Sequence, residues 1–535
     1  MTDLTLRSPD AAAFDQTVRQ LVADKVASGI HDQNPTLWGP DAEHEASIRL
    51  SWVGLAESSR PLVAEINALR DELRADGVDH VVLAGMGGSS LAPEVITATA
   101  GVGLVTLDTT DAGQVSAALA EKLERTVLVV SSKSGGTVET DSHRRVYEKA
   151  FTDAGIDAAS RIVVVTDPGS PLEQIGRDAG YRKVFLADPN VGGRYSALTA
   201  FGLVPSGLAG ADIGALLDEA ASVSDALGAD DPANDGLRLG TLLGLAHNAG
   251  SEKVVLADTG SGITGFGDWV EQLIAESTGK LGKGLLPVVV ETAGAPGFAD
   301  AGTDAILVSL GPDAGVEPKS GYAADVRQPL GAAFLLWEYA IAVAGRIIGI
   351  NPFDQPNVEE AKAQARTLLD KSDSGPAPEP AFVEGAVEVY GDEQVLHGAK
   401  TLSAVLSALR DLAPAEGYLS VQAYLDRHAD ASAADLRAAI ARSTGLETTF
   451  GWGPRFLHST GQYHKGGHAN GGFIQITGAV AEDLAIPDRP YSFAVLQRAQ
   501  AAGDAAVIEG KGRPVLHLHL TDRAAGLGQL MEAIS

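Results

Sequence analysis

The segment VVLAGMGGSS, residues 81–90, joins a short apolar run to a turn of glycine and serine, and a helical pattern follows it. The same order recurs with VLVV at 127–130 before SSKSGGT at 131–137, and with IVVV at 162–165 before a Thr-Asp-Pro turn. Continuous apolar runs that alternate with helices are typical of parallel strands buried on both faces of a sheet. The sequence therefore predicts a doubly wound α/β domain around these runs.

The remainder of the chain predicts two further α/β domains. Apolar runs at 254–256, 287–290 and 305–308 lead to an apolar helix at 331–350. The segment SDSGPAPEP (372–380) then interrupts both helix and strand, because proline and glycine disfavour either. We expect an N-terminal helical segment (1–65), a first α/β domain (66–230), a second α/β domain (231–372), a linker (373–384) and a C-terminal α/β domain (385–535).

The composition excludes several classes of function. The chain has 535 residues, no cysteine and a formal net charge of -30. Without cysteine there are no disulfides, thiolate metal sites or cysteine nucleophiles, which fits a cytoplasmic protein. A strongly acidic surface repels phosphate backbones and anionic lipids, so we expect neither a nucleic-acid partner nor a membrane partner. A local pocket can still bind a small phosphorylated molecule.

Neither of two segments that resemble targeting or membrane signals supports one. Residues 1–15 lack the basic and apolar regions of a signal peptide. The apolar stretch 331–350 contains Glu338 and Arg346, which favours a buried core helix over a membrane span.

Two strand-to-helix turns, 85–90 and 131–137, are rich in glycine and hydroxyl groups. Glycine lets the backbone approach an anion, and the following helix presents unpaired N–H groups and a partial positive charge. Both turns follow parallel strands, where open α/β sheets bind ligands. We therefore predict a phosphate site there; the alternative is that both are ordinary tight turns. Neither turn matches the NTPase phosphate loop.

The segment Gly260–Gly265 matches the G-x-G-x-x-G pattern of dinucleotide-binding proteins after a predicted strand. Such a site also needs an acidic residue about 20 positions further on. Lys280 stands at that distance from Gly260, so we expect no nicotinamide cofactor.

Four motifs occur in a fixed order along the chain: SKSGGTVET (132–140), GGRYS (192–196), QLIAESTGK (272–280) and the segment from GINPFDQP to Lys362 (349–362). Together they resemble the glucose-6-phosphate isomerase family. The resemblance implies two doubly wound sugar-isomerase (SIS-type) domains followed by the C-terminal α/β domain. It also implies interconversion of glucose 6-phosphate and fructose 6-phosphate through a cis-enediolate, in glycolysis and gluconeogenesis. No metal or other cofactor is expected, and the family is usually dimeric.

The resemblance assigns roles to matching positions. Glu276 corresponds to the base that moves a proton between neighbouring carbons, and Arg194 to the cation beside the enediolate. Lys362 corresponds to a lysine near the ring oxygen. Each also has an ordinary alternative: a surface carboxylate, a structural salt bridge and a surface lysine. The remaining predicted substrate-binding residues are Gly88, Ser89, Ser132, Lys133, Ser134, Thr137 and Gln272.

The family also uses a histidine for ring opening, and this chain has none between His247 and His397. The segment HSTGQYHKGGH (458–468) resembles the C-terminal region of isomerases fused to transaldolases. We select His464 from it as the ring-opening candidate. A purely structural role stays open, whereas the intervening glycines disfavour a metal site formed by His464 and His468.

Two alternatives to this function stay open. A dual glucose/mannose 6-phosphate isomerase differs only in stereochemistry at one carbon, which the motifs do not distinguish. A non-catalytic sugar-phosphate sensor would need the phosphate turns but no base, so the presence of Glu276 and Arg194 disfavours it.

Overall fold

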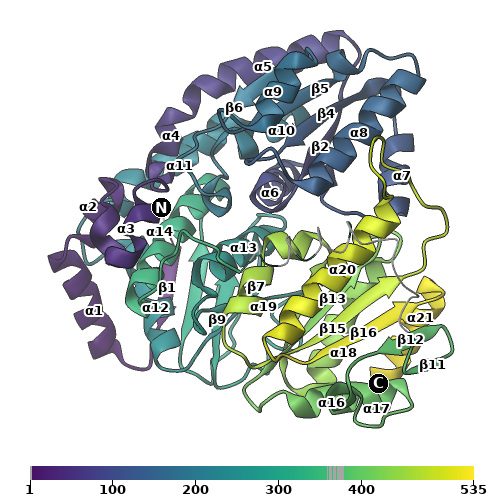
Figure 1. Cartoon of the computed structure of the whole chain (residues 1–535). Coiled ribbons are helices and arrows are strands. Elements are labelled where there is room, and N and C mark those ends of the chain that lie inside the picture. The colour runs from purple at the N-terminus through teal and green to yellow at the C-terminus, as the bar shows by residue number, and fades with distance from the viewer. Residues whose placement is uncertain (1–2, 358–359, 361–363, 365–368, 370–378, 535) are drawn as a thin grey trace.

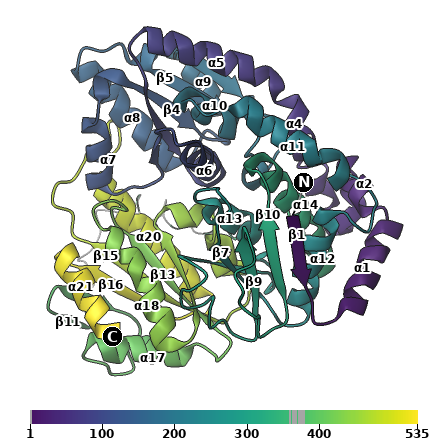
Figure 2. The same ribbon diagram turned by 180° about the vertical axis from the view of Figure 1, so that it is seen from behind.

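The computed structural model describes residues 3–357, 360, 364, 369 and 379–534. Three lobes, each built on its own sheet, surround a central region that contains α6 (Leu91–Ala100) and α13 (Phe266–Thr278) (Figures 1 and 2). Helices alternate with parallel strands in all three lobes, so the predicted α/β class is confirmed.

The first sheet is parallel throughout, in the order β3–β2–β4–β5–β6. Its strands are β2 (His80–Gly85), β3 (Val105–Leu107), β4 (Thr126–Ser131), β5 (Ile162–Thr166) and β6 (Lys183–Leu186). Besides α6, the helices of this region are α5 (Arg60–Ala75), α7 (Ala112–Ala120), α8 (Val138–Asp153), α9 (Pro171–Asp178), α10 (Ala200–Ala209) and α11 (Ile213–Leu227). The turns after β2 and β4 leave neighbouring strands at the point where the strand order reverses, which is where open α/β sheets bind ligands.

The second sheet has the order β1–β10–β9–β7–β8. Its strands are β7 (Lys253–Asp258), β8 (Leu286–Val290), β9 (Ala305–Leu310), β10 (Ala323–Arg327) and the antiparallel edge strand β1 (Asp3–Arg7). Its helices, with those of the N-terminal segment, are α1 (Ala11–Ala23), α2 (Val26–His31), α3 (Pro40–Ala46), α4 (Leu55–Ser58), α12 (Asp235–Asn248), α13 and α14 (Leu330–Ile348).

Strand β1 lies within the N-terminal segment 1–65, which the sequence predicts as helical. It pairs with β10 from Asp3↔Arg327 to Arg7↔Ala323, and Leu4 and Leu6 pack against the core. The alternation Asp-Leu-Thr-Leu-Arg was visible in the sequence. A strand of five residues at a sheet edge buries only one face, so its signal is weak.

The third sheet has the order β11–β12–β16–β15–β13–β14. Its strands are β11 (Phe382–Glu384), β12 (Val387–Tyr390), β13 (Tyr418–Tyr424), β14 (Glu447–Trp452), β15 (Gly471–Gly478) and β16 (Val515–Leu520). Its helices are α16 (Glu393–Leu396), α17 (Leu402–Leu412), α18 (Asp435–Thr444), α19 (Gly461–Gly466), α20 (Phe493–Gly510) and α21 (Arg523–Ile534). The predicted linker 373–384 therefore ends in a strand, and residues 373–378 of it lie outside the described part of the chain.

The three sheets share one strand order. Numbered along the chain within each sheet, the first four parallel strands lie in the order 2-1-3-4 in every lobe. The third lobe adds β11 and β12 as an antiparallel pair beside β16. The molecule is thus three variations of one doubly wound arrangement.

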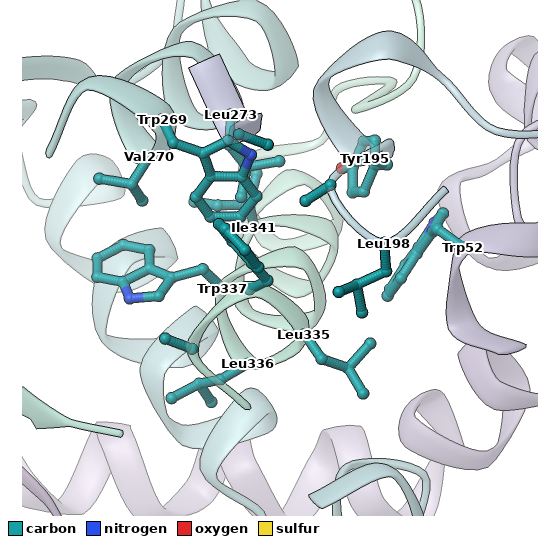
Figure 3. Packing of buried hydrophobic residues seen from close by; sticks show 14 of the residues in the cluster. Trp52, Tyr195, Leu198, Trp269, Val270, Leu273, Leu335, Leu336, Trp337 and Ile341 are labelled. Atoms are coloured by element: carbon teal, nitrogen blue, oxygen red, sulfur yellow. The ribbon is translucent and has the colours of Figure 1, made fainter. Parts of the chain in front are cut away.

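Helix α14 lies at the centre of the core that joins the first two lobes. Its side chains pack against Trp269 and Leu273 of α13 on one side and against the Tyr195–Leu198 region on another (Figure 3). Its length and apolarity would suffice to cross a membrane, but 89% of its most apolar window is buried inside the protein. This packing fixes α13 from behind, and α13 carries the predicted base.

Candidate active site

A cavity of about 680 Å³ lies among the three lobes. The first lobe contributes the two glycine- and hydroxyl-rich turns, the second contributes Gln272 and Glu276 of α13, and the C-terminal lobe contributes Leu457, His458, Leu496 and Gln500. The predicted phosphate turns and the predicted base therefore line one space.

The hydroxyl groups of the two turns converge on this cavity. Ser89, Ser132, Ser134 and Thr137 all line it, and the hydroxyls of Ser132 and Thr137 lie 2.9 Å apart. Gly88 also lines it, and a Cβ there would lie 2.0 Å from the carbonyl oxygen of Gly193. Gly88 therefore permits close contact between the β2 turn and the loop that carries Arg194.

Two cations that line the cavity, Lys133 and Arg49, are paired with carboxylates. Nζ of Lys133 donates to Asp167 at 2.5 Å and to the carbonyl of Pro189 at 3.2 Å. Arg49, from the N-terminal segment, also lines the cavity and pairs with Glu45 at 2.8 Å. Sequence reasoning missed Arg49, because nothing in its local sequence distinguishes it from other surface arginines.

Glu276 and Arg194 are in contact. Nε of Arg194 lies 3.2 Å from Oε2 of Glu276, and the amide of Gln272, one helical turn earlier, donates to the same oxygen at 3.3 Å. Glu276 is 7% exposed and lines the cavity, whereas Arg194 is 2% exposed and lies beside it. The helical spacing predicts that Gln272 and Glu276 share a face, and in the structure Gln272 and Arg194 both contact the Glu276 carboxylate.

The segment Pro352–Gln355 fixes the guanidinium from the other side. Arg194 donates hydrogen bonds to the carbonyl oxygens of Pro352 (3.3 Å) and Asp354 (3.2 Å) and to the side chain of Gln355. Lys280, at the end of the α13 motif, holds the same segment through Asn351 and Asp354 at 2.6–2.7 Å. Burial lowers the pKa of Lys280 to about 7. Three of the predicted motifs therefore form one connected unit around the predicted base.

His464, the selected histidine, does not line the cavity. Its ring is 2% exposed inside the C-terminal lobe, with Nδ1 3.1 Å from the Tyr418 hydroxyl and Nε2 3.4 Å from the Ser420 hydroxyl. Burial, then the charges of Lys465 and Arg513, holds the pKa of His464 well below its usual range. The geometry therefore indicates a structural role for His464.

His458, from the same segment, lines the cavity instead. Its Nε2 lies 3.1 Å from Oε1 of Glu139, which belongs to the SKSGGTVET motif at the start of α8. The side chains are 13% and 4% exposed respectively. A carboxylate only accepts hydrogen bonds, so Nε2 carries the proton and Nδ1 is the basic atom of the neutral ring. Helix α19 turns its own histidine into the lobe, which the sequence alone did not reveal.

Comparison with known proteins decides the family. A family model for phosphoglucose isomerase matches residues 70–306. A Methanococcus maripaludis protein named "Probable glucose-6-phosphate isomerase" is 30% identical over 295 residues, which are 47% of this chain and 67% of that protein. The chain belongs to the phosphoglucose isomerase family.

Other relatives agree with the assignment to the phosphoglucose isomerase family. A protein of the same name from Natronomonas pharaonis is 28% identical over 387 residues, covering 62% of this chain and 88% of that protein. Among solved structures, a Chlamydia trachomatis glucose-6-phosphate isomerase has a TM-score of 0.54 at 18% identity, covering 68% of this chain and 86% of that one. At that identity the likeness concerns the fold alone.

The phosphoglucose isomerase match leaves part of the chain unexplained. It ends at residue 306, so the third sheet, Phe382–Leu520, and His458 lie beyond it. Lys362, the predicted ring-oxygen lysine, lies outside the described residues. Among the residues that the structure describes, no group of three histidine or acidic side chains could hold a metal ion.

Proposed function

We propose that this member of the phosphoglucose isomerase family interconverts glucose 6-phosphate and fructose 6-phosphate in the cavity described above. The observation that carries the proposal is the contact between Glu276 and Arg194 beside two hydroxyl-lined turns in one space. Such a site offers a base, a fixed positive charge and a phosphate anchor, which aldose–ketose isomerisation requires.

In this proposal the hydroxyls of Ser89, Ser132, Ser134 and Thr137 hold the substrate phosphate. The N-terminus of α8 adds backbone N–H groups and a partial positive charge. The side chain of Lys133 is paired with Asp167, which offsets its positive charge. Lys133 therefore contributes mainly its backbone. Arg49 adds a second cation at the same end.

The carbonyl chemistry takes place at α13. The carboxylate of Glu276 takes the C2 proton of open-chain glucose 6-phosphate and returns it to C1, while the hydroxyl proton passes from O2 to O1. The intermediate is a cis-enediolate, whose negative charge the adjacent Arg194 stabilises. Arg194 has carbonyl partners that fix it, so the charge is in place before the reaction begins.

The ring must open before this step, and His458 replaces His464 in our proposal for it. His458 moves a proton from the C1 hydroxyl to the ring oxygen as the C1–O5 bond breaks, with Nδ1 as the exchanging atom. Glu139 accepts a hydrogen bond from Nε2 and so orients the ring. Lys362 stays a prediction for the neighbourhood of the ring oxygen, and dimer formation stays a prediction from the family.

A coupled assay on fructose 6-phosphate tests the proposal, with Glu276→Gln as the variant and Glu271→Gln as its matched control. Glu271 precedes Gln272 on the same helix but lines a different, smaller cavity. Loss of the base should lower kcat by at least about 100-fold, while the control keeps its activity. An inactive wild type, or equal activity in wild type and Glu276→Gln, would contradict the proposal. Mannose 6-phosphate in the same assay tests the dual-specificity alternative.

A further inference from the structure

Gln500, a residue of the C-terminal lobe, bridges Glu139 and Thr110 of the first lobe. It lies on α20, lines the cavity and is 4% exposed. Its Nε2 donates to Oε1 of Glu139 at 2.6 Å, and its Oε1 accepts from the Thr110 hydroxyl at 2.8 Å. Thr110 follows β3 and is fully buried.

The chemistry of these groups fixes the direction of every hydrogen bond. A carboxylate cannot donate, so the Gln500 amide must present its NH₂ group to Glu139. Its carbonyl then faces Thr110, whose hydroxyl donates. A flipped amide would bring two acceptors together at Glu139. Thr110 therefore donates to Gln500, and Gln500 and His458 both donate to Glu139, which is the acceptor at which the hydrogen bonds converge.

The same oxygen of Glu139 receives both the Gln500 amide and the His458 ring. A buried carboxylate with two donors on one oxygen is held in position. The position and charge of Glu139 in turn set the tautomer and orientation of His458. Both α20 and the His458 turn belong to the C-terminal lobe, beyond the residues matched by the family model.

We propose that Gln500 is a positioning residue for ring opening: its amide, aligned by Thr110, holds Glu139 so that His458 can transfer the proton. This inference rests on the proposed function, because it assigns a role within one step of that reaction. It predicts an effect on the ring-opening step, since the side-chain hydrogen bonds of Gln500 go to Thr110 and to the carboxylate that contacts His458.

Gln500→Met tests this proposal, because methionine has similar length but no amide. The full-length enzyme is assayed with fructose 6-phosphate and with 5-deoxyfructose 6-phosphate, which lacks the hydroxyl that closes the ring. We expect kcat/KM for fructose 6-phosphate to fall about tenfold and that for the acyclic substrate to stay unchanged. The deuterium isotope effect on glucose 6-phosphate labelled at C2 should move toward unity, because ring opening then limits the rate.

Two further variants complete the experiment. Gln497→Met is the matched control, since Gln497 is equally buried one turn earlier on α20 but does not line the cavity. Thr110→Val removes the group that aligns the amide and should give a smaller effect with the same preference for the cyclic substrate. It tests the proposal even if Gln500→Met fails to fold.

The outcomes separate the two proposals. A wild type that converts neither substrate overturns the proposed function, and the role of Gln500 falls with it. An active wild type with a variant that slows both substrates equally indicates a structural role and overturns the inference alone. An active wild type with variants that slow neither substrate has the same consequence.

Discussion

The cavity has two kinds of wall, and they differ in how the sequence encodes them. In the first two lobes the wall is made of contiguous motifs, such as 132–140 and 272–280, each on one turn or one helix. In the C-terminal lobe it is made of single side chains, among them His458 and Gln500, which reach Glu139 from 319 and 361 positions away in the chain. Motifs reveal the first kind of wall, and only the folded arrangement reveals the second.

The two walls also differ in how they are held. Apolar packing of α14 fixes α13, whereas ion pairs fix the His458 turn. Arg455, at the start of that turn, contacts Glu94 at 2.5 Å, Asp108 at 3.3 Å and Asp268 at 3.5 Å. Although burial opposes it, Arg455 and Arg427 bring the pKa of Glu94 down to about 2. The C-terminal wall therefore depends on charge.

The largest expected effect comes from breaking this charge cluster. Arg455→Met removes a buried cation shared by three carboxylates and leaves the buried Asp108 with only Arg427, 3.8 Å away, which costs about 3–5 kcal/mol of unfolding free energy. Denaturant unfolding measures it, with Arg177→Met as an exposed control that should change little. A loss no larger than in the control would show that the ion pairs do not hold the C-terminal wall.

The next effect separates two histidines of one segment. His458→Ala should lower kcat/KM for fructose 6-phosphate by about 100-fold and spare 5-deoxyfructose 6-phosphate. His464→Ala should lower stability but keep the ratio of the two activities. If His464→Ala alone changes that ratio, His464 and not His458 takes part in ring opening, and the geometric assignment is wrong.

How far the sequence could lead is clear from these residues. The buried strands and the pairing of Glu276 with Arg194 were predictable, because apolar runs and matched motifs are local signals. His458 was not separable from His464, since both lie in one segment and only the direction of α19 distinguishes them. Arg49 and Gln500 had no local signal, because their roles arise from contacts between distant parts of the chain.

The smallest expected effect concerns pH at the contact between α8 and α20. His143 is fully buried, stacks on Phe493 at 5.6 Å, and has Nε2 2.8 Å from the Thr109 carbonyl, while Nδ1 has no partner. Burial lowers the pKa of His143 to about 4 from 6.5. Between about pH 6.5 and pH 4, His143 therefore binds a proton in the unfolded chain but not in the folded protein. Stability is lost as the pH falls through this range.

Measured as unfolding free energy, the loss between pH 7 and pH 5 from this group is about 2 kcal/mol. The His143→Phe variant should lose about 2 kcal/mol less unfolding free energy than the wild type between pH 7 and pH 5, because phenylalanine does not titrate. The difference between the two proteins isolates His143 from other groups that titrate in both. Equal losses in both proteins would rule out this contribution.

The most direct measurement is a crystal structure of Glu276→Gln with fructose 6-phosphate bound. The account predicts phosphate on the hydroxyls of Ser89, Ser132, Ser134 and Thr137, C1 and C2 beside residue 276, and His458 of the same chain next to the ring oxygen. A sugar phosphate bound away from residue 276, or a ring oxygen that faces no residue of the C-terminal lobe, would contradict it.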